Sequence, residues 1–180
     1  RAKEVLISSG SIERPLVFGN NDTPGVMLSS AAKEYLKVYG VLVGKKPLIF
    51  TNNDSGYETA IEFKKNGVDP IILDTRKEPK SEIIDEAKKL DIQIKFSYVV
   101  VAAKGYKKVK SAEVAKISDD KKKLGALENI NCDCICVSGF WTPTIHLASQ
   151  SGNKTTFNKD IDAFVPGKSK QNDKSLPWKR

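Results

Sequence analysis

The stretch FTNNDSGYETA, residues 50–60, decides the fold because it joins an apolar run to a helical one. The run PLIF at 47–50 enters it as a buried strand would, and YETAIEFKKNG at 57–67 leaves it with helical spacing. A second apolar run, IILD, follows at 71–74. A strand, a tight turn, a helix and a second strand ending in an acid is the plan of a dinucleotide-binding unit. The pattern therefore predicts an α/β, Rossmann-like sheet flanked by helices.

The turn lacks most of the glycines of such a unit. In the fingerprint G-x-G-x-x-G/A, the glycines permit a tight turn, close approach of the backbone to a pyrophosphate, and close packing of helix on strand. Thr51 takes the first of these positions, Asn53 the second and Gly56 the third. Because a side chain at Asn53 fills space that the pyrophosphate needs, we expect a degenerate site, marked by Asn53, Gly56 and Asp74, that has lost its own nucleotide.

Two acids near the turn have separate interpretations. Asp54 would put negative charge where an anion binds at a helix N-terminus, so we interpret it as the helix cap, accepting backbone N–H groups. Asp74 stands about where the ribose-binding acid of a dinucleotide domain belongs. A strand-end residue that pairs with Arg76 is an equal alternative for Asp74.

Other segments fill in the architecture. Apolar residues at helical spacing over 27–39 predict a helix that Gly40 ends, and SEIIDEAKKL at 81–90 predicts another that Ser81 caps. Residues 92–117 alternate as a small antiparallel segment would, with a turn at AAKGYKKV.

The three cysteines lie in one strand-like stretch, CDCIC at 132–136, which runs into a loop, GFWTP. Alternate positions would place Cys132, Cys134 and Cys136 on one strand face. Three thiolates so nearly in line do not surround a metal tetrahedrally, so we interpret them as small buried side chains and expect no metal site. Trp141, just past the strand, is interpreted as a plug at the edge of the core.

Composition limits the partners. The chain has 180 residues and a net charge of +8, but its lysines are spread out without interleaved aromatic residues, which does not favour nucleic-acid binding. The apolar runs fall short of the roughly 20 residues of a membrane helix. An odd number of clustered cysteines is a poor disulfide framework. We expect a soluble protein of a reducing cytoplasm, with no nucleic-acid or membrane partner.

The sequence offers no catalytic group. His146, the one histidine, has no visible orienting carboxylate, and the chain has no G-x-S-x-G elbow. We interpret His146 as a loop or helix-start residue. Arg14, in ERP, could lie near a ligand phosphate, because a guanidinium fits phosphate oxygens. Pairing with a glutamate or a backbone carbonyl is an equal alternative for Arg14.

Several stretches, in order, resemble the alpha subunit of heterotetrameric sarcosine oxidase. They are LISSGSIERPLVFGNNDTPGVML at 6–28, IFTNNDSGYETA at 49–60, CDCICVSGFWTPTIHLASQSG at 132–152 and AFVPG at 163–167. The resemblance runs from about residue 4 to 167. It departs from the family pattern at Ser8, where Thr is common, and at Phe140, where a second glycine is common.

The resemblance implies a fold of two nested FAD/NAD(P)-binding domains of the glutathione-reductase type, of which this chain is an internal piece. In it LISSGS returns to the first domain, with Ser9 and Gly10 near a bound nucleotide. The implied division is residues 1–39 as a first-domain segment with a connecting helix, 40–150 as the inserted Rossmann-like domain, 151–167 as a return segment, and 168–180 as a polar, disordered tail. The first strand, at 4–8, would then lack its neighbours and pair elsewhere or dangle.

The resemblance also implies a function for the whole assembly. The alpha subunit binds NAD, while FAD and FMN belong to the complex outside this segment. The partners are the beta, gamma and delta subunits and the remainder of the alpha chain. The reaction converts sarcosine, tetrahydrofolate and oxygen into glycine, methylenetetrahydrofolate and hydrogen peroxide. This chain would support NAD binding and assembly without oxidising the amine. Two alternatives are a related opine, proline or cyanide-forming oxidase subunit, and a non-catalytic docking domain.

Overall fold

The computed structural model describes residues 5–120, 122–168 and 173–175. The chain forms two compact units, Pro15–Gly139 and a second made of Arg1–Arg14 with Phe140–Arg180. Among the described residues, no helix has both the length and the apolar character that crossing a membrane requires.

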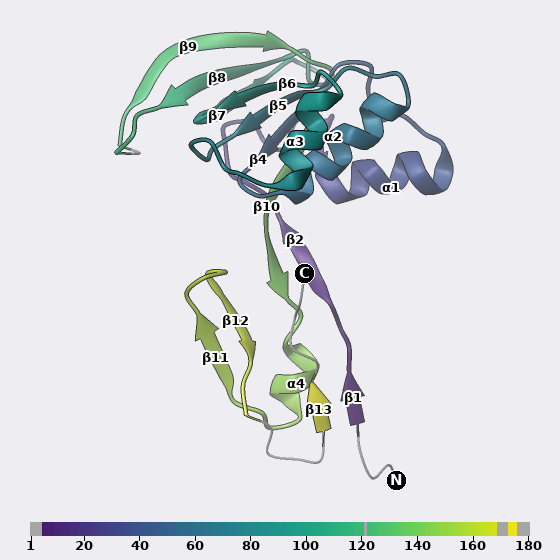
Figure 1. Cartoon of the computed structure of the whole chain (residues 1–180), viewed down its shortest axis with the longest axis vertical. Coiled ribbons are helices and arrows are strands. Elements are labelled where there is room, and N and C mark those ends of the chain that lie inside the picture. The colour runs from purple at the N-terminus through teal and green to yellow at the C-terminus, as the bar shows by residue number, and fades with distance from the viewer. Residues whose placement is uncertain (1–4, 121, 169–172, 176–180) are drawn as a thin grey trace. The chain divides into compact units, whose positions relative to one another are not determined.

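The unit Pro15–Gly139 is built on a parallel sheet (Figure 1). Its strands lie in the order β3-β10-β4-β5-β6, and every neighbouring pair is parallel. Their bounds are β3 Val26–Leu28, β10 Cys134–Pro143, β4 Pro47–Thr51, β5 Ile71–Asp74 and β6 Gln93–Phe96. The predicted Rossmann-like α/β fold is confirmed: β4, helix α2 (Ser55–Lys65) and β5 form its strand–helix–strand unit.

Three helices cover one face of this sheet: α1 (Ser29–Tyr39), α2 and α3 (Glu82–Lys89) (Figure 1). The core between them joins Ile49 and Ile72 of the sheet to Tyr57 and Phe63 of α2, all buried. Gly40 ends α1 in the left-handed conformation, at φ +64°, as predicted.

An antiparallel sheet covers the other face. It consists of β7 (Tyr98–Lys104), β8 (Ser111–Ile117) and β9 (Leu124–Asn131), in that order. Leu48, Phe50 and Leu73 pack against it, on the opposite side of their strands from Ile49 and Ile72. A strand with apolar neighbours on both faces needs a continuous apolar run, which explains the sequence PLIF.

The compact units divide the chain at other points than the sequence-based expectation of 39/40 and 150/151. The boundary at 39/40 differs because the residues before it pack with the parallel sheet. β3 hydrogen-bonds to β10, with Met27 opposite Cys136, and α1 buries Ala32 and Leu36 in the helix-side core. Residues 26–39 therefore pack with the parallel sheet of Pro15–Gly139.

The second unit contains β2 (Ser11–Arg14), helix α4 (His146–Gln150) and the hairpin of β11 (Thr155–Asn158) with β12 (Ala163–Pro166). His146 opens α4, as predicted. Strand β1 (Val5–Ile7) pairs in parallel with β13 (Asp173–Ser175). The predicted disordered tail at 168–180 therefore contains a strand, while 169–172 and 176–180 lie outside the described residues.

The stretch GFWTP is strand, not the predicted loop, because β10 continues to Pro143. Trp141 thus lies within the strand and is half-buried. Phe140 takes a φ of +32°, a region that glycine adopts without strain.

The predicted single face of the three cysteines is wrong for Cys132. Cys134 and Cys136 face the helices, whereas Cys132 belongs to the core under the antiparallel sheet. The alternation breaks because Cys132 precedes β10 and the Asp133 carboxylate accepts the backbone N–H groups of Lys45 and Lys46 at 2.8 Å each. Burial, helped by Cys134 and Asp133, raises the pKa of the Cys132 thiol to about 12. No group of side chains in the described part of the chain is arranged to hold a metal ion.

Helix α2 approaches β4 closely at Gly56. A Cβ atom on Gly56 would lie 2.7 Å from both Cβ and Oγ1 of Thr51. Both residues are buried, and Thr51 is a strand residue whose Cβ has little freedom to move. The glycine is therefore required for the packing of this helix on this strand.

We predict that Gly56→Ala lowers the free energy of unfolding by about 1–3 kcal/mol through overpacking, although alanine favours helix. Urea unfolding followed by circular dichroism measures the change. Thr51→Gly removes every atom of Thr51 that the new methyl group would meet. The cost of Gly56→Ala should therefore fall by more than half in a Thr51→Gly background, and an unchanged cost would contradict this packing account.

Candidate functional site

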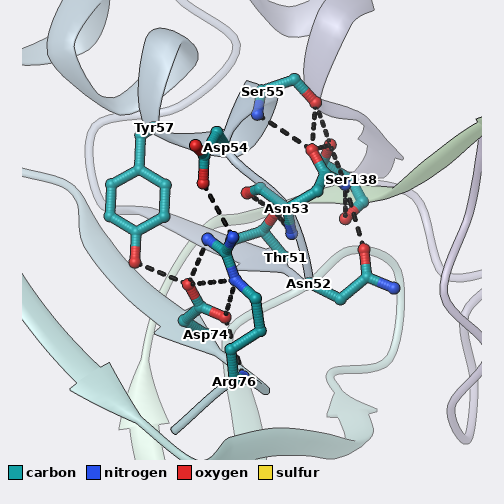
Figure 2. A network of polar contacts seen from close by, with 9 residues as sticks. All are labelled: Thr51, Asn52, Asn53, Asp54, Ser55, Tyr57, Asp74, Arg76 and Ser138. Carbon is teal, nitrogen blue, oxygen red and sulfur yellow. Dashed lines mark hydrogen bonds and ion pairs between the residues drawn. The ribbon is translucent and has the colours of Figure 1, made fainter. Parts of the chain in front are cut away.

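The candidate site lies where parallel strands end. Thr51 closes β4, Asp74 closes β5, and Ser138 lies beside Thr51 on β10. Ligands of doubly wound sheets bind beyond the carboxyl ends of the strands. The turn at 51–55 and the first residues of α2 occupy this edge (Figure 2).

Thr51 closes the turn in place of the first glycine. Its hydroxyl donates to the carbonyl of Asn53 at 2.8 Å and accepts the N–H of Asn53 at 3.1 Å. A side chain thus fixes the tight turn that a glycine would otherwise permit. Gly56 keeps the packing position that the sequence predicted.

Asn53 fills the turn in place of the second glycine. Its side chain is buried, and its amide nitrogen donates to the carbonyl of Ser138 at 3.2 Å (Figure 2). Its amide oxygen accepts the backbone N–H of Ser55 at 2.9 Å and also the Ser55 hydroxyl. The backbone N–H of Asn52 donates to the same Ser138 carbonyl at 3.3 Å. These contacts hold the turn against β10. Both the nitrogen and the oxygen of the Asn53 side-chain amide are thus hydrogen-bonded within the chain.

The predicted capping role of Asp54 is wrong. Asp54 is at the N-cap position of α2, but its carboxylate makes no capping hydrogen bond. It pairs instead with Nη1 of Arg76 at 2.8 Å. The oxygen of Asn53 accepts the Ser55 N–H group and so does part of the work expected of Asp54.

Asp74 is completely buried, with 0% of its side chain exposed. Its Oδ2 accepts the Tyr57 hydroxyl at 2.7 Å and Nη2 of Arg76 at 2.8 Å. Its Oδ1 accepts the backbone N–H of Arg76 at 2.9 Å and Nε at 3.1 Å. The pairing with Arg76 that the sequence offered as an alternative is confirmed. Both oxygens that a ribose would use are already hydrogen-bonded within the chain.

The same network sets two protonation states. Burial first, and then the charge and hydrogen bond of Asp74, raise the pKa of Tyr57 far above its ordinary value. Burial acts to lower the pKa of Arg76, but hydrogen bonds and charge from Asp74 and Asp54 outweigh it and raise the pKa. Tyr57 therefore stays protonated and donates its hydrogen bond, Arg76 stays positively charged, and neither changes its protonation state near neutral pH.

Ser9, Gly10 and Arg14 lie in the other compact unit. The Ser9 hydroxyl donates to the carbonyl of Thr144 at 2.6 Å, and Gly10, at φ +66°, accepts the N–H of Thr144 at 2.9 Å. Arg14 donates to the carbonyls of Asp162 at 3.4 Å and Ile161 at 3.5 Å, which is the backbone pairing that the sequence left open. Their role toward a nucleotide stays a prediction.

Two residues of the network carried no signal in the sequence. Tyr57 belongs to a helical pattern that indicates only a buried face, and Ser138 lies in a strand-like stretch without a motif. The position of Ser138 could have been found from the rule that parallel strands end at one edge, once β10 is known to lie beside β4.

Comparisons with known proteins identify the fold first. No protein-family model matches the chain. Thioredoxin reductase of T. acidophilum superimposes with a TM-score of 0.68 at 19% identity, over 86% of this chain and 50% of that one. The bacillithiol disulfide reductase Bdr of Staphylococcus aureus gives 0.66 at 16% identity, over 94% and 52%. L-Proline dehydrogenase of P. horikoshii gives 0.62 at 21%, over 97% and 29%. The chain therefore shares its Rossmann-like fold with these two reductases and this dehydrogenase.

The resemblance seen in the sequence is then confirmed. The chain is 37% identical over 174 residues to sarcosine oxidase subunit alpha of Rhizobium meliloti, and 33% identical over 168 residues to that of a Corynebacterium species. Each alignment covers 92% of this chain but only 16% and 17% of the respective relative. The chain thus spans about a sixth of the length of a sarcosine oxidase alpha subunit and is similar to that part of it.

We predict that Tyr57 of the folded chain stays protonated at pH values where the tyrosines of the unfolded chain ionise. The unfolded chain titrates all five of its tyrosines near pH 10. Because the folded-state pKa of Tyr57 is raised, its contribution to stability is present below about pH 10 and is lost as the pH rises further. Tyrosinate absorbance at 295 nm should show at least one tyrosine fewer in the folded chain than in the chain in urea. Tyr57→Phe should reduce that difference by one tyrosine, and an equal count in both states of the unaltered chain would contradict the prediction.

Proposed function

We propose that the chain is a structural and nucleotide-supporting part of the alpha subunit of a sarcosine oxidase. In this part, side chains of the turn at 51–55, here called the closed turn, fill the space that a nucleotide would need. The observation that carries the proposal is the similarity over 92% of the chain to sarcosine oxidase subunit alpha. The fold that the chain shares with oxidoreductases such as thioredoxin reductase agrees with it. The assembled enzyme is an oxidoreductase acting on the CH–NH group of sarcosine, with tetrahydrofolate and oxygen as co-substrates.

In this proposal NAD is bound by the intact alpha subunit through its first domain, to which Ser9 and Gly10 belong. FAD and FMN lie elsewhere in the complex, and the beta, gamma and delta subunits and the remainder of the alpha chain are the partners. The three cysteines are buried thiols, which suits a reducing cytoplasm. The chain itself contributes packing and position and carries no amine-oxidising group.

The closed turn supports assigning the cofactor to the first domain. A pyrophosphate would need the space that the Asn53 side chain fills, and a ribose would need the oxygens of Asp74 that Tyr57 and Arg76 already use. The carboxylate of Asp54 adds negative charge at the same helix N-terminus. Each of these features opposes a bound dinucleotide.

A second candidate is a domain of dinucleotide-binding type that serves only to dock other subunits. The same closed turn favours it, because a site without room for a cofactor leaves only surface and packing as functions. A related oxidase acting on proline or another secondary amine is supported by the likeness to L-proline dehydrogenase, which is a likeness of fold.

We predict that NAD leaves the turn of the unit Pro15–Gly139 undisturbed. In a titration followed by heteronuclear NMR, the amides of Asn53, Gly56 and Asp74 should show no saturable shift up to millimolar NAD. Saturable shifts confined to these amides would contradict the closed site. With the complete alpha subunit, NAD should bind, and Tyr57→Phe, which keeps the Asp74–Arg76 pair, should leave its dissociation constant within about twofold because in this proposal Tyr57 does not touch the cofactor. Full-length enzyme that oxidises proline in preference to sarcosine would overturn the choice of substrate.

A further inference from the structure

The turn between β7 and β8 presents a cationic loop, residues 104–110, with the sequence KGYKKVK. Tyr106 at its tip is 93% exposed, which is unusual for an aromatic side chain. Tyr106 and the three lysines Lys107, Lys108 and Lys110 line a hollow of about 400 Å³. None of these four side chains contributes to the turn at 51–55.

The cationic loop is held in one conformation. Val109 is completely buried in the core under the antiparallel sheet, and its N–H donates to the carbonyl of Pro24 at 2.9 Å. The N–H of Lys110 donates to the carbonyl of Lys104 at 2.8 Å. Gly105 takes a φ of +152°, and a Cβ atom there would lie 1.9 Å from the carbonyl oxygen of Lys108. With Val109 anchored inward, its neighbours Lys108 and Lys110 are exposed on either side.

The charge of the cationic loop is largely uncompensated. Lys104 forms an ion pair with Glu113 at 3.4 Å, and Glu113 is the one acid between residues 104 and 113. Lys107, Lys108 and Lys110 form no ion pair with any described residue. Because the backbone of the loop is already held in place, binding an anion would have to order only the exposed lysine side chains.

The chemistry of the cationic loop fits carboxylates of a protein. An exposed tyrosine is typical of the centre of protein interfaces, where an aromatic side chain gives contact area at a small entropic cost. A nucleic acid would favour a continuous stripe of cations, but the next lysines of the antiparallel sheet, Lys116 and Lys123, lie at the other end of β8. That strand has 7 residues, and the two groups are therefore about 20 Å apart.

We propose that the cationic loop is a docking site for an acidic segment of a partner protein, which places carboxylates against Lys107, Lys108 and Lys110 and an apolar side chain against Tyr106. Charge complementarity selects the occupant and steers its approach. This docking site does not depend on NAD binding or on the substrate of the assembled enzyme.

The test uses the whole chain and a short dye-labelled peptide in which glutamate and serine alternate around a central leucine. Fluorescence anisotropy should show saturable binding that weakens with salt. Lys107→Glu/Lys108→Glu should weaken it about tenfold or more, because two attractions become repulsions. Tyr106→Ser should weaken it about threefold or more through the lost apolar contact. The control is Lys80→Glu/Lys89→Glu, which makes the same charge change at two exposed positions, one before α3 and one at its last residue, and should alter binding less than about twofold.

Urea unfolding of each variant separates loss of fold from loss of binding, because an unchanged midpoint shows that the surface alone was altered. Absence of saturable binding up to millimolar peptide, or an equal loss in the control variant, would overturn the proposal. So would tighter binding of an oligothymidylate or of phosphatidylserine vesicles at the same salt concentration, which would assign the loop to phosphate groups of a nucleic acid or a lipid surface.

Discussion

The buried carboxylate of Asp74 is the interaction on which the candidate site depends. A charge with no exposure must be paired and fully hydrogen-bonded, since its desolvation otherwise costs several kcal/mol. Its partners come from two places: Tyr57 from α2, and Arg76 from the chain that follows β5. Arg76 then reaches Asp54 at the beginning of α2. One buried charge thus fixes the end of β5, the start of α2 and the path of the chain after β5.

The turn has exchanged one kind of contact for another. Glycines at its first two positions would let the backbone approach a phosphate, whereas Thr51 and Asn53 use their side chains to hydrogen-bond the backbone of the turn and of β10. The third position keeps Gly56 because its task, the contact of α2 with β4, is independent of any ligand. The strand–helix–strand elements of a dinucleotide-binding unit are therefore present, while the side chain of Asn53 occupies space that a pyrophosphate would need.

Sequence patterns predicted the elements that depend on neighbours along the chain. PLIF and IILD are continuous apolar runs because their strands have apolar neighbours on both faces, and the helical spacing of Tyr57, Ala60 and Ile61 follows from one buried face. The wrong predictions concern side chains whose contacts are with residues far away in the sequence. Asp54 does not cap α2 because its carboxylate pairs with Arg76. Cys132 does not share a face with Cys134 because the Asp133 carboxylate accepts the backbone N–H groups of Lys45 and Lys46, which are distant in the sequence. Ser138 enters the site only because β10 inserts beside β4, an order of strands that no local pattern specifies.

The energetics of the network around the turn at 51–55 support the proposal that no nucleotide binds there. A nucleotide ribose that took the oxygens of Asp74 would displace Arg76, and the carboxylate would then be buried without its cation. Breaking such a pair costs about 3–5 kcal/mol, whereas a hydrogen bond from a neutral hydroxyl contributes about 1 kcal/mol. The pyrophosphate would meet the further obstacles of the Asn53 side chain and the Asp54 carboxylate. Removing the Asn53 side chain alone would not open the site, because Arg76 would still lie across Asp74 and the turn would lose its hydrogen bonds to Ser138 and Ser55. Each part of the network makes the others harder to replace, and the turn is stable as a joint between β4, β5, β10 and α2 for that reason.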